Sequence, residues 1–136
     1  MRLPLFLSFL LGSALHSQAM IGESREQCVA RYGPVRAEPK PGEPTLFVKA
    51  GFALMIVFER GRAVSLSYQR LTTDAPNHSK PITDDAIQLL LETNAPKAKW
   101  CRDKPSNKGR VWTTTDGKLV GFYDDASNVF SIQSKK

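Results

Sequence analysis

The most apolar part of the chain beyond its first 20 residues begins at Phe52. From Phe52 to Phe58 apolar side chains fall on both sides of an extended chain, which predicts a central strand covered on both faces. From Val64 to Tyr68 apolar residues alternate with small polar ones, which predicts a strand with one buried face. Arg60-Gly61 lies between the two segments and predicts a two-residue turn, with glycine at positive φ.

Capping residues and helical spacing predict two short helices. Ser24 and Gln27 have the spacing of a capping box, so a helix is expected from Arg25 to Tyr32. Thr83 can cap a second helix from Asp84 to Thr93, in which isoleucine and leucine recur at helical spacing and would face the core. At about two turns the first helix is too short to be stable alone, and the apolar faces of both helices should pack on the sheet.

Four further segments have the pattern of strands. A short one is expected at Thr45 to Lys49, and three more at Val111 to Thr115, Lys118 to Tyr123 and Asn128 to Gln133. Asp116-Gly117, between the second and third of these, is the strongest hairpin signal in the chain. The order helix, three strands, helix, three strands predicts an α+β fold in which two helices cover an antiparallel sheet.

The first 19 residues have the pattern of a cleaved signal peptide. Arg2 precedes an apolar run from Leu3 to Leu15, and cleavage is expected after Ala19. The run is shorter than the ~20 residues that span a bilayer. We therefore expect an exported protein, periplasmic or extracellular, with one α+β domain over residues 20–136. No later segment could cross a membrane, and no cysteine follows the cleavage site to take a lipid anchor.

Two cysteines, Cys28 and Cys101, remain in the expected exported domain. Export favours a disulfide between them, worth about 4 kcal/mol in the chain-entropy account. The alternative is two unpaired thiols, one of them buried in a helix face. Asn77, in the sequence Asn-His-Ser, would be a glycosylation site only in a eukaryotic host.

The chain carries a formal net charge of +6, and its positive charge is concentrated in one predicted loop over residues 97–110. Six basic residues there face a single acidic one, Asp103, and two tryptophans accompany them. The candidate binding residues are Lys97, Lys99, Trp100, Arg102, Lys104, Lys108, Arg110 and Trp112. Such a loop could bind a polyanion, with tryptophan stacking on it. The alternative is a solvated loop that its tryptophans anchor to the core.

Residues typical of catalysis are few. His78 is the only histidine beyond the signal peptide, and it lies in a polar segment. No spacing of His, Cys or carboxylates predicts a metal site, and no glycine-rich loop predicts a phosphate site. We therefore expect no enzyme activity, no cofactor and no metal. A hydrolase with an unrecognised site is a third hypothesis, and it would need a cleft with converging polar groups.

Two segments in the first half of the chain carry a family resemblance: Arg31 to Pro34 (RYGP), which ends the first helix, and Phe58 to Val64 (FERGRAV). Over Ser24 to Tyr68 the chain resembles small exported bacterial proteins of unknown function. Its layout is similar to that of outer-membrane assembly lipoproteins and β-lactamase inhibitor proteins. The resemblance implies a binding or assembly role without catalysis, and the missing lipidation cysteine is a departure from the lipoproteins.

Two functions follow as expectations. The first is a non-enzymatic exported module that binds another protein through an open sheet face and the loops around Trp100. Its outward residues would be Ser65, Ser67, Thr113 and Thr115, and a sheet edge could accept a strand from a partner. The alternative is a polyanion or envelope-surface binder that acts through loop 97–110.

Overall fold

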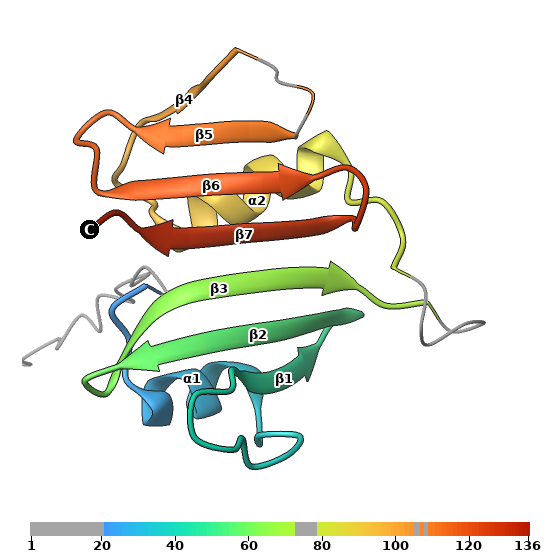
Figure 1. Ribbon diagram of the computed structural model, residues 1–136, viewed down its shortest axis with the longest axis vertical. Coiled ribbons are helices and arrows are strands. Elements are labelled where there is room, and N and C mark those ends of the chain that lie inside the picture. Colours follow the sequence, from blue (N-terminus) through green and yellow to red (C-terminus); the bar gives the residue numbers. More distant parts are fainter. Residues whose placement is uncertain (1–20, 73–78, 105–106, 108) are drawn as a thin grey trace, which may run out of the picture.

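The computed structural model describes residues 21–72, 79–104, 107 and 109–136. They form two helices and a seven-stranded antiparallel sheet, which confirms the predicted α+β class (Figure 1). The helices are α1 (Arg25–Tyr32) and α2 (Asp84–Asn94). The strands are β1 (Thr45–Lys49), β2 (Phe52–Glu59), β3 (Arg62–Arg70), β4 (Trp100–Arg102), β5 (Arg110–Thr114), β6 (Leu119–Asp124) and β7 (Val129–Ser134).

The sheet consists of two meanders joined side by side. The strand order is β1-β2-β3-β7-β6-β5-β4, so the last strand of each meander pairs with the other at β3 and β7. β7 therefore lies at the centre of the sheet, whereas β2 is second from an edge. The expectation that Phe52 to Phe58 forms a central strand was wrong, because the order of strands depends on which hairpins meet.

Both helices lie on the same face of the sheet. α1 lies near β1 and β2, and α2 crosses behind the other meander (Figure 1). Leu54 and Ile56 of β2 face the helices and are buried, whereas Val57 on the opposite face is 39% exposed. The prediction that this strand is covered on both sides was therefore wrong: two short helices cover one face of the sheet only.

The predicted turns and caps are confirmed. Ser24 forms the full capping box with Gln27, and the Thr83 side chain accepts a hydrogen bond from Ala86 N. Arg60 and Gly61 both take positive φ, 50° and 75°, the combination a two-residue hairpin turn with right-handed strand twist requires. These local signals set the ends of the elements, which is why sequence located them well.

The seventh strand, β4, lies inside the segment expected to be a loop. It has only three residues and pairs with β5 in the register Trp100–Thr114, Cys101–Thr113 and Arg102–Trp112. A strand of three residues is too short to show alternation of apolar and polar side chains. It forms only because β5 pairs with it. The second meander therefore has four strands, not three.

The predicted disulfide is wrong. Cys28 is a buried free thiol on α1, and Cys101 is an exposed free thiol on β4. α1 contacts β1, and β4 is the opposite edge of the sheet. At the usual strand spacing the two edges are roughly 29 Å apart, whereas bonded cysteines need Cα atoms within about 7 Å. The two thiols therefore cannot meet in this fold.

Three expectations concern residues outside the described part of the chain: the signal peptide over residues 1–19, Asn77 as a glycosylation site, and Lys108 in the basic loop. Within the described residues, no helix has both the length and the apolar character needed to cross a membrane.

Candidate functional site

The sheet face opposite the helices, called the open face below, combines apolar and hydroxyl side chains in rows across the strands. One row follows the strand register from β1 to β5: Leu46, Met55, Ser67, Ser131, Phe122 and Val111. A second row runs from β2 to β4: Val57, Ser65, Gln133, Val120, Thr113 and Cys101. Each row is thus polar over the central strands and apolar on β2 and β6.

The central polar strip is ordered by its own hydrogen bond. Ser67 Oγ on β3 and Ser131 Oγ on β7 lie 3.1 Å apart. Both serines are half-buried, although no helix covers them. The expected outward direction of Ser65, Ser67 and Thr113 fits this register, and Thr115 follows just beyond the end of β5.

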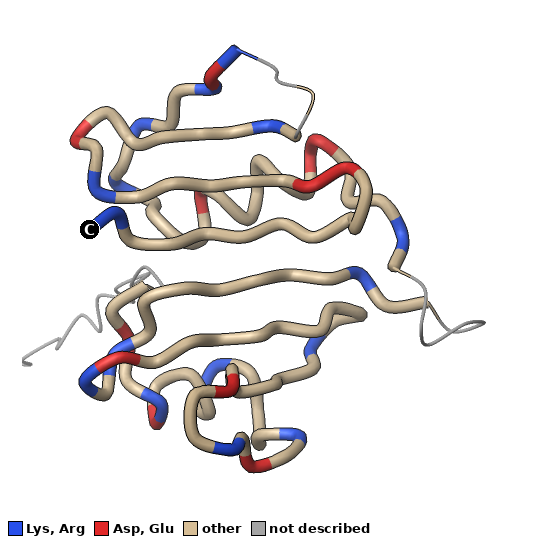
Figure 2. Tube along the Cα trace, viewed as in Figure 1, with Lys and Arg blue, Asp and Glu red and all other residues tan. Residues whose placement is uncertain are grey.

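Charged residues surround the open face and do not enter its two rows. In Figure 2 the strands are uncharged over most of their length, and Lys, Arg, Asp and Glu gather at strand ends and in loops. An uncharged centre inside a charged rim is the composition typical of protein-binding surfaces.

The two tryptophans of the predicted basic loop belong to the core side of the sheet. Trp112 is buried and packs edge to face on Phe130, with ring centroids 5.9 Å apart. Trp100 is half-buried, and its indole Nε1 donates to the carbonyl of Leu91 on α2 at 3.1 Å. Both rings therefore pack against the core, which supports the anchoring alternative.

Arg110 also has a structural partner set. Its guanidinium forms ion pairs with Asp84, in the first turn of α2, and with Asp125, in the turn before β7. It also lies over the Tyr123 ring, 4.6 Å from the centroid. Arg110 thus ties three segments together and is not available as a free cation.

Four basic residues of the segment remain exposed near β4: Lys97, Lys99, Arg102 and Lys104. They are called the basic edge below. The Arg102 guanidinium lies 5.7 Å from the centre of the Trp112 ring, which holds this side chain against the sheet. Asp103 is the only acidic residue between Lys97 and Lys104. The structure thus keeps part of the predicted basic site together along one edge strand.

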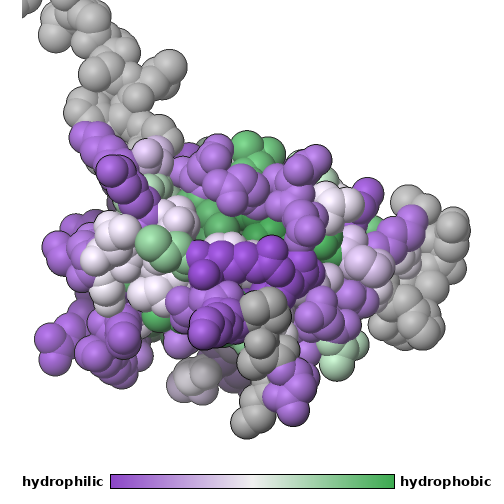
Figure 3. All heavy atoms as spheres, turned by 90° about the horizontal axis from the view of Figure 1, so that it is seen from above, coloured by the Kyte–Doolittle hydropathy of each residue, from purple (hydrophilic) through white to green (hydrophobic). Residues whose placement is uncertain are grey.

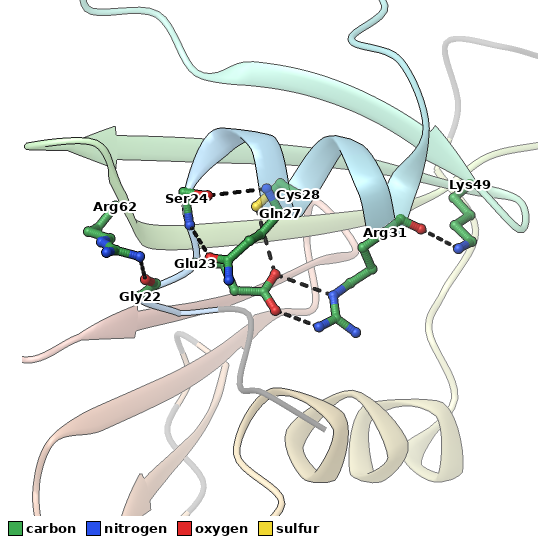
Figure 4. Close-up of polar contacts among 8 residues, drawn as sticks. All are labelled: Gly22, Glu23, Ser24, Gln27, Cys28, Arg31, Lys49 and Arg62. Carbon is green, nitrogen blue, oxygen red and sulfur yellow. Dashed lines mark hydrogen bonds and ion pairs between the residues drawn. The ribbon is translucent and has the colours of Figure 1, made fainter. Parts of the chain in front are cut away.

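A buried carboxylate lies at the start of α1. Glu23 is only 3% exposed, and its carboxylate points toward the side chain of Arg31 on α1 (Figure 4). Arg31 donates from Nε at 3.3 Å and from a terminal nitrogen at 2.5 Å, and the Cys28 thiol points at the same carboxylate, 4.0 Å from Oε2. Burial, and next the Glu23 charge, raise the pKa of Cys28 to about 11. This thiol is therefore protonated and poorly nucleophilic at neutral pH.

A second buried polar group joins the two halves of the molecule. Asn94, at the end of α2, donates to Tyr68 Oη at 3.0 Å, and Tyr68 is hydrogen-bonded in turn to Tyr32 of α1. Burial raises the pKa of Tyr68 to about 12, and it raises that of Tyr32 further. Both phenols are therefore neutral, and they connect α1 to α2 across the centre of the sheet.

These buried groups hold both helices against the core through polar contacts. Glu23 forms an ion pair with Arg31, and burial keeps both tyrosines protonated at neutral pH. In the described residues, no three His, Cys, Asp or Glu side chains come close enough to hold a metal ion.

Sequence reasoning missed the apolar parts of the open face. Met55 and Val57 were expected under a covering layer, and their exposure could have been suspected only from the small number and short length of the helices. The hydroxyl side chains on β3 and β5 were found because strict alternation marks a one-sided strand.

The structure is therefore that of an α+β domain with one uncovered, uncharged sheet face and a basic edge strand. Comparison of the chain with models of known protein families, with curated proteins and with solved structures gives no match. The resemblance to exported assembly and inhibitor proteins therefore stays an expectation.

Proposed function

We propose that this protein is a non-enzymatic exported module that binds another protein through the open face. The observation that carries the proposal is the pair of side-chain rows across this face, apolar on β2 and β6, polar over the central strands β3 and β7, and uncharged throughout. The rim around them holds the charges (Figure 2). Export rests on the signal-peptide pattern of the sequence.

The dimensions of the open face suit a protein partner. Seven strands at the usual spacing span roughly 29 Å, and strands of five or six residues run roughly 17–20 Å. The open face alone covers roughly 490–580 Å² at these dimensions. A standard interface takes about 800 Å² from each partner, so the contact would also extend onto the rim. A small molecule would instead need a deep concave pocket.

Affinity capture with matched variants tests this proposal. Phe122→Lys and Val57→Lys place a charge on the open face, and Leu89→Lys places one on the exposed side of α2, where Leu89 is 63% exposed. The wild type and the α2 variant should recover the same partner from the host's exported fraction, and the open-face variants should lose it. A desolvated unpaired charge weakens such an interface by about tenfold or more.

Purified partner and protein are then titrated directly, with thermal unfolding to show that each variant is folded. The proposal fails if the open-face variants bind as tightly as the wild type.

A second candidate function is polyanion binding through the basic edge. The observation in its favour is the exposure of four basic residues in one short segment, Lys97, Lys99, Arg102 and Lys104. Binding of this kind depends on electrostatics and falls steeply with salt. Trp100 and Trp112 pack against α2 and Phe130, so the charge of the basic edge carries this candidate without a stacking contribution.

Heparin chromatography tests the second candidate. The wild type should elute well above 0.15 M salt, about the physiological ionic strength, and a variant with Lys97, Lys99 and Lys104 changed to Gln should elute early. A matched variant that loses Lys40, Lys135 and Lys136 has the same net charge and should be retained. Equal retention of the two variants would show that only net charge matters.

A further inference from the structure

The two edges of the sheet differ in how they are covered. At the β1 edge, the proline-rich connector lies alongside the strand, and Arg36 N donates to the carbonyl of Leu46 at 2.9 Å. At the β4 edge, no other strand of the described chain follows. The backbone groups along β4 are therefore the ones that a further strand could reach.

The pairing of β4 with β5 determines which groups are available. Lys99 O accepts from Thr115 N, and Asp103 N donates to Val111 O, both at 2.9 Å. Antiparallel residues alternate between bonding to one neighbour strand and pointing away from it. Trp100 and Arg102 lie at the alternate positions, so their N–H and C=O groups point outward from the sheet.

A hollow lies beneath this edge, on the helix side. A cavity of about 230 Å³ opens between α2 and β4, with apolar lining from Ile87, Trp100 and Trp112 and a polar rim from Asp84, Gln88 and Arg102. Figure 3, which looks onto the β4 edge, shows apolar surface surrounded by hydrophilic side chains. An extended segment paired with β4 would direct alternate side chains toward this hollow and the others toward the open face. An apolar side chain could enter on the first of these sides.

The charge of the edge selects among possible occupants. Lys97, Lys99, Arg102 and Lys104 form the basic edge, and a second copy of this chain would bring the same cations against them. Short length and Lys or Arg residues are the features with which natural edge strands resist self-pairing. An acidic strand would instead neutralise them.

We propose that β4 binds an extended acidic segment of a partner protein, which adds to the sheet as a further strand. This proposal rests on the proposed function, and it specifies the chemistry of one part of the partner. Backbone hydrogen bonds to Trp100 and Arg102 supply the register, an apolar side chain fills the hollow, and carboxylates face the basic edge.

A pair of synthetic peptides tests the proposal without any host protein. The first is a peptide of about seven residues that alternates Glu with Val. The second has the same sequence but is N-methylated at its central residues, so it keeps its charge and loses the N–H groups of a strand. We expect the first to bind by calorimetry and the second to bind at least about tenfold more weakly.

A matched pair of protein variants tests the same edge. Arg102→Pro removes an outward N–H and a charge, and it leaves the β4–β5 hydrogen bonds intact because the backbone N–H of Arg102 points away from β5. Arg102→Gln removes the charge alone. Both Arg102 variants lose the guanidinium over Trp112, so that contact does not separate them. The proline variant should bind the Glu-Val peptide about fivefold to tenfold more weakly than the glutamine variant. Lys40→Gln, on the remote connector, is the control and should bind like the wild type.

Equal affinity for both peptides, or equal affinity of the two Arg102 variants, would overturn the proposal and leave electrostatic attraction alone. If heparin then binds at the edge that accepts both peptides equally, that edge is a polyanion-binding surface. If Arg102→Pro does not fold, the peptide pair still decides. The peptide titration needs no host partner, and affinity capture depends only on the open-face variants. A failure of the titration therefore leaves the proposed function standing, whereas a failure of the capture experiment would not.

Discussion

At the residue scale, the two cysteines show how position determines chemistry. Cys28 is fully buried, beside a carboxylate, and its pKa is raised to about 11, chiefly by burial and next by the Glu23 charge. Cys101 is exposed at the end of a row on the open face. The same two residues were expected to form one bond, because export favours disulfides and a sequence contains no distances.

Thiol labelling checks this assignment. Under native, non-reducing conditions an exposed-thiol reagent at pH 8 should modify one cysteine per chain quickly, and a Cys101→Ser variant should lose that fast reaction. The second thiol should react only in denaturant, because the native state keeps Cys28 protonated and covered. If neither thiol reacts in denaturant without reductant, the two cysteines are bonded and the fold described here is wrong.

At the element scale, the hairpin between β5 and β6 depends on its turn. Gly117 N donates to Thr114 O at 2.8 Å, with Gly117 at positive φ. Asp116 Oδ1 accepts from Thr114 Oγ1 at 2.7 Å and from Lys118 N at 3.0 Å. These hydrogen bonds to the ionised carboxylate, that of Thr114 first, lower its pKa below the ordinary 3.8.

The direction of this shift predicts a pH dependence. The folded pKa of Asp116 lies below the unfolded one, so ionisation stabilises the fold above pH 3.8, and this contribution is lost as the pH falls through the folded pKa. Asp116→Asn should lower the denaturation midpoint at pH 7 more than at pH 2.5. Thr115→Ala, which changes an exposed residue of the same hairpin that does not ionise, should show no such difference. Parallel pH profiles for the two variants would contradict the prediction.

At the scale of the whole molecule, the two meanders depend on one strand junction and one shared core. β3 and β7 pair at the centre of the sheet, and Phe130 of β7 contacts both halves. Its ring stacks on Tyr68 of β3, with centroids 6.3 Å apart, and meets Trp112 of β5 edge to face. Helices α1 and α2 are linked beneath this junction by the Tyr32, Tyr68 and Asn94 hydrogen bonds.

Truncation at this junction should weaken the whole fold. Phe130 is fully buried, so Phe130→Ala should lower the free energy of unfolding by about 3–5 kcal/mol. Phe122→Ala, on the open face, should cost much less because that ring is only partly covered. Chemical denaturation followed by tryptophan fluorescence and by circular dichroism measures both. Two separate transitions in the wild type would show that the meanders unfold independently.

The sequence by itself determined both helices and six of the seven strands, with their approximate ends. Caps such as Ser24 and Thr83, the Arg60-Gly61 turn and the alternation after Val64 depend on neighbouring residues, so each could be predicted from a short segment. The alternation of apolar and polar residues also predicted that Ser65 and Ser67 lie on the outward face of the sheet.

Only the tertiary structure decided which strands became neighbours, because pairing between β3 and β7, or between β4 and β5, joins segments through contacts that no local pattern encodes. That pairing separated Cys28 from Cys101 across the sheet. It turned Met55 and Val57 outward and packed Trp100 and Trp112 against α2 and the core. The candidate surfaces, an uncharged open face and a basic edge, exist because the strand order puts distant residues side by side.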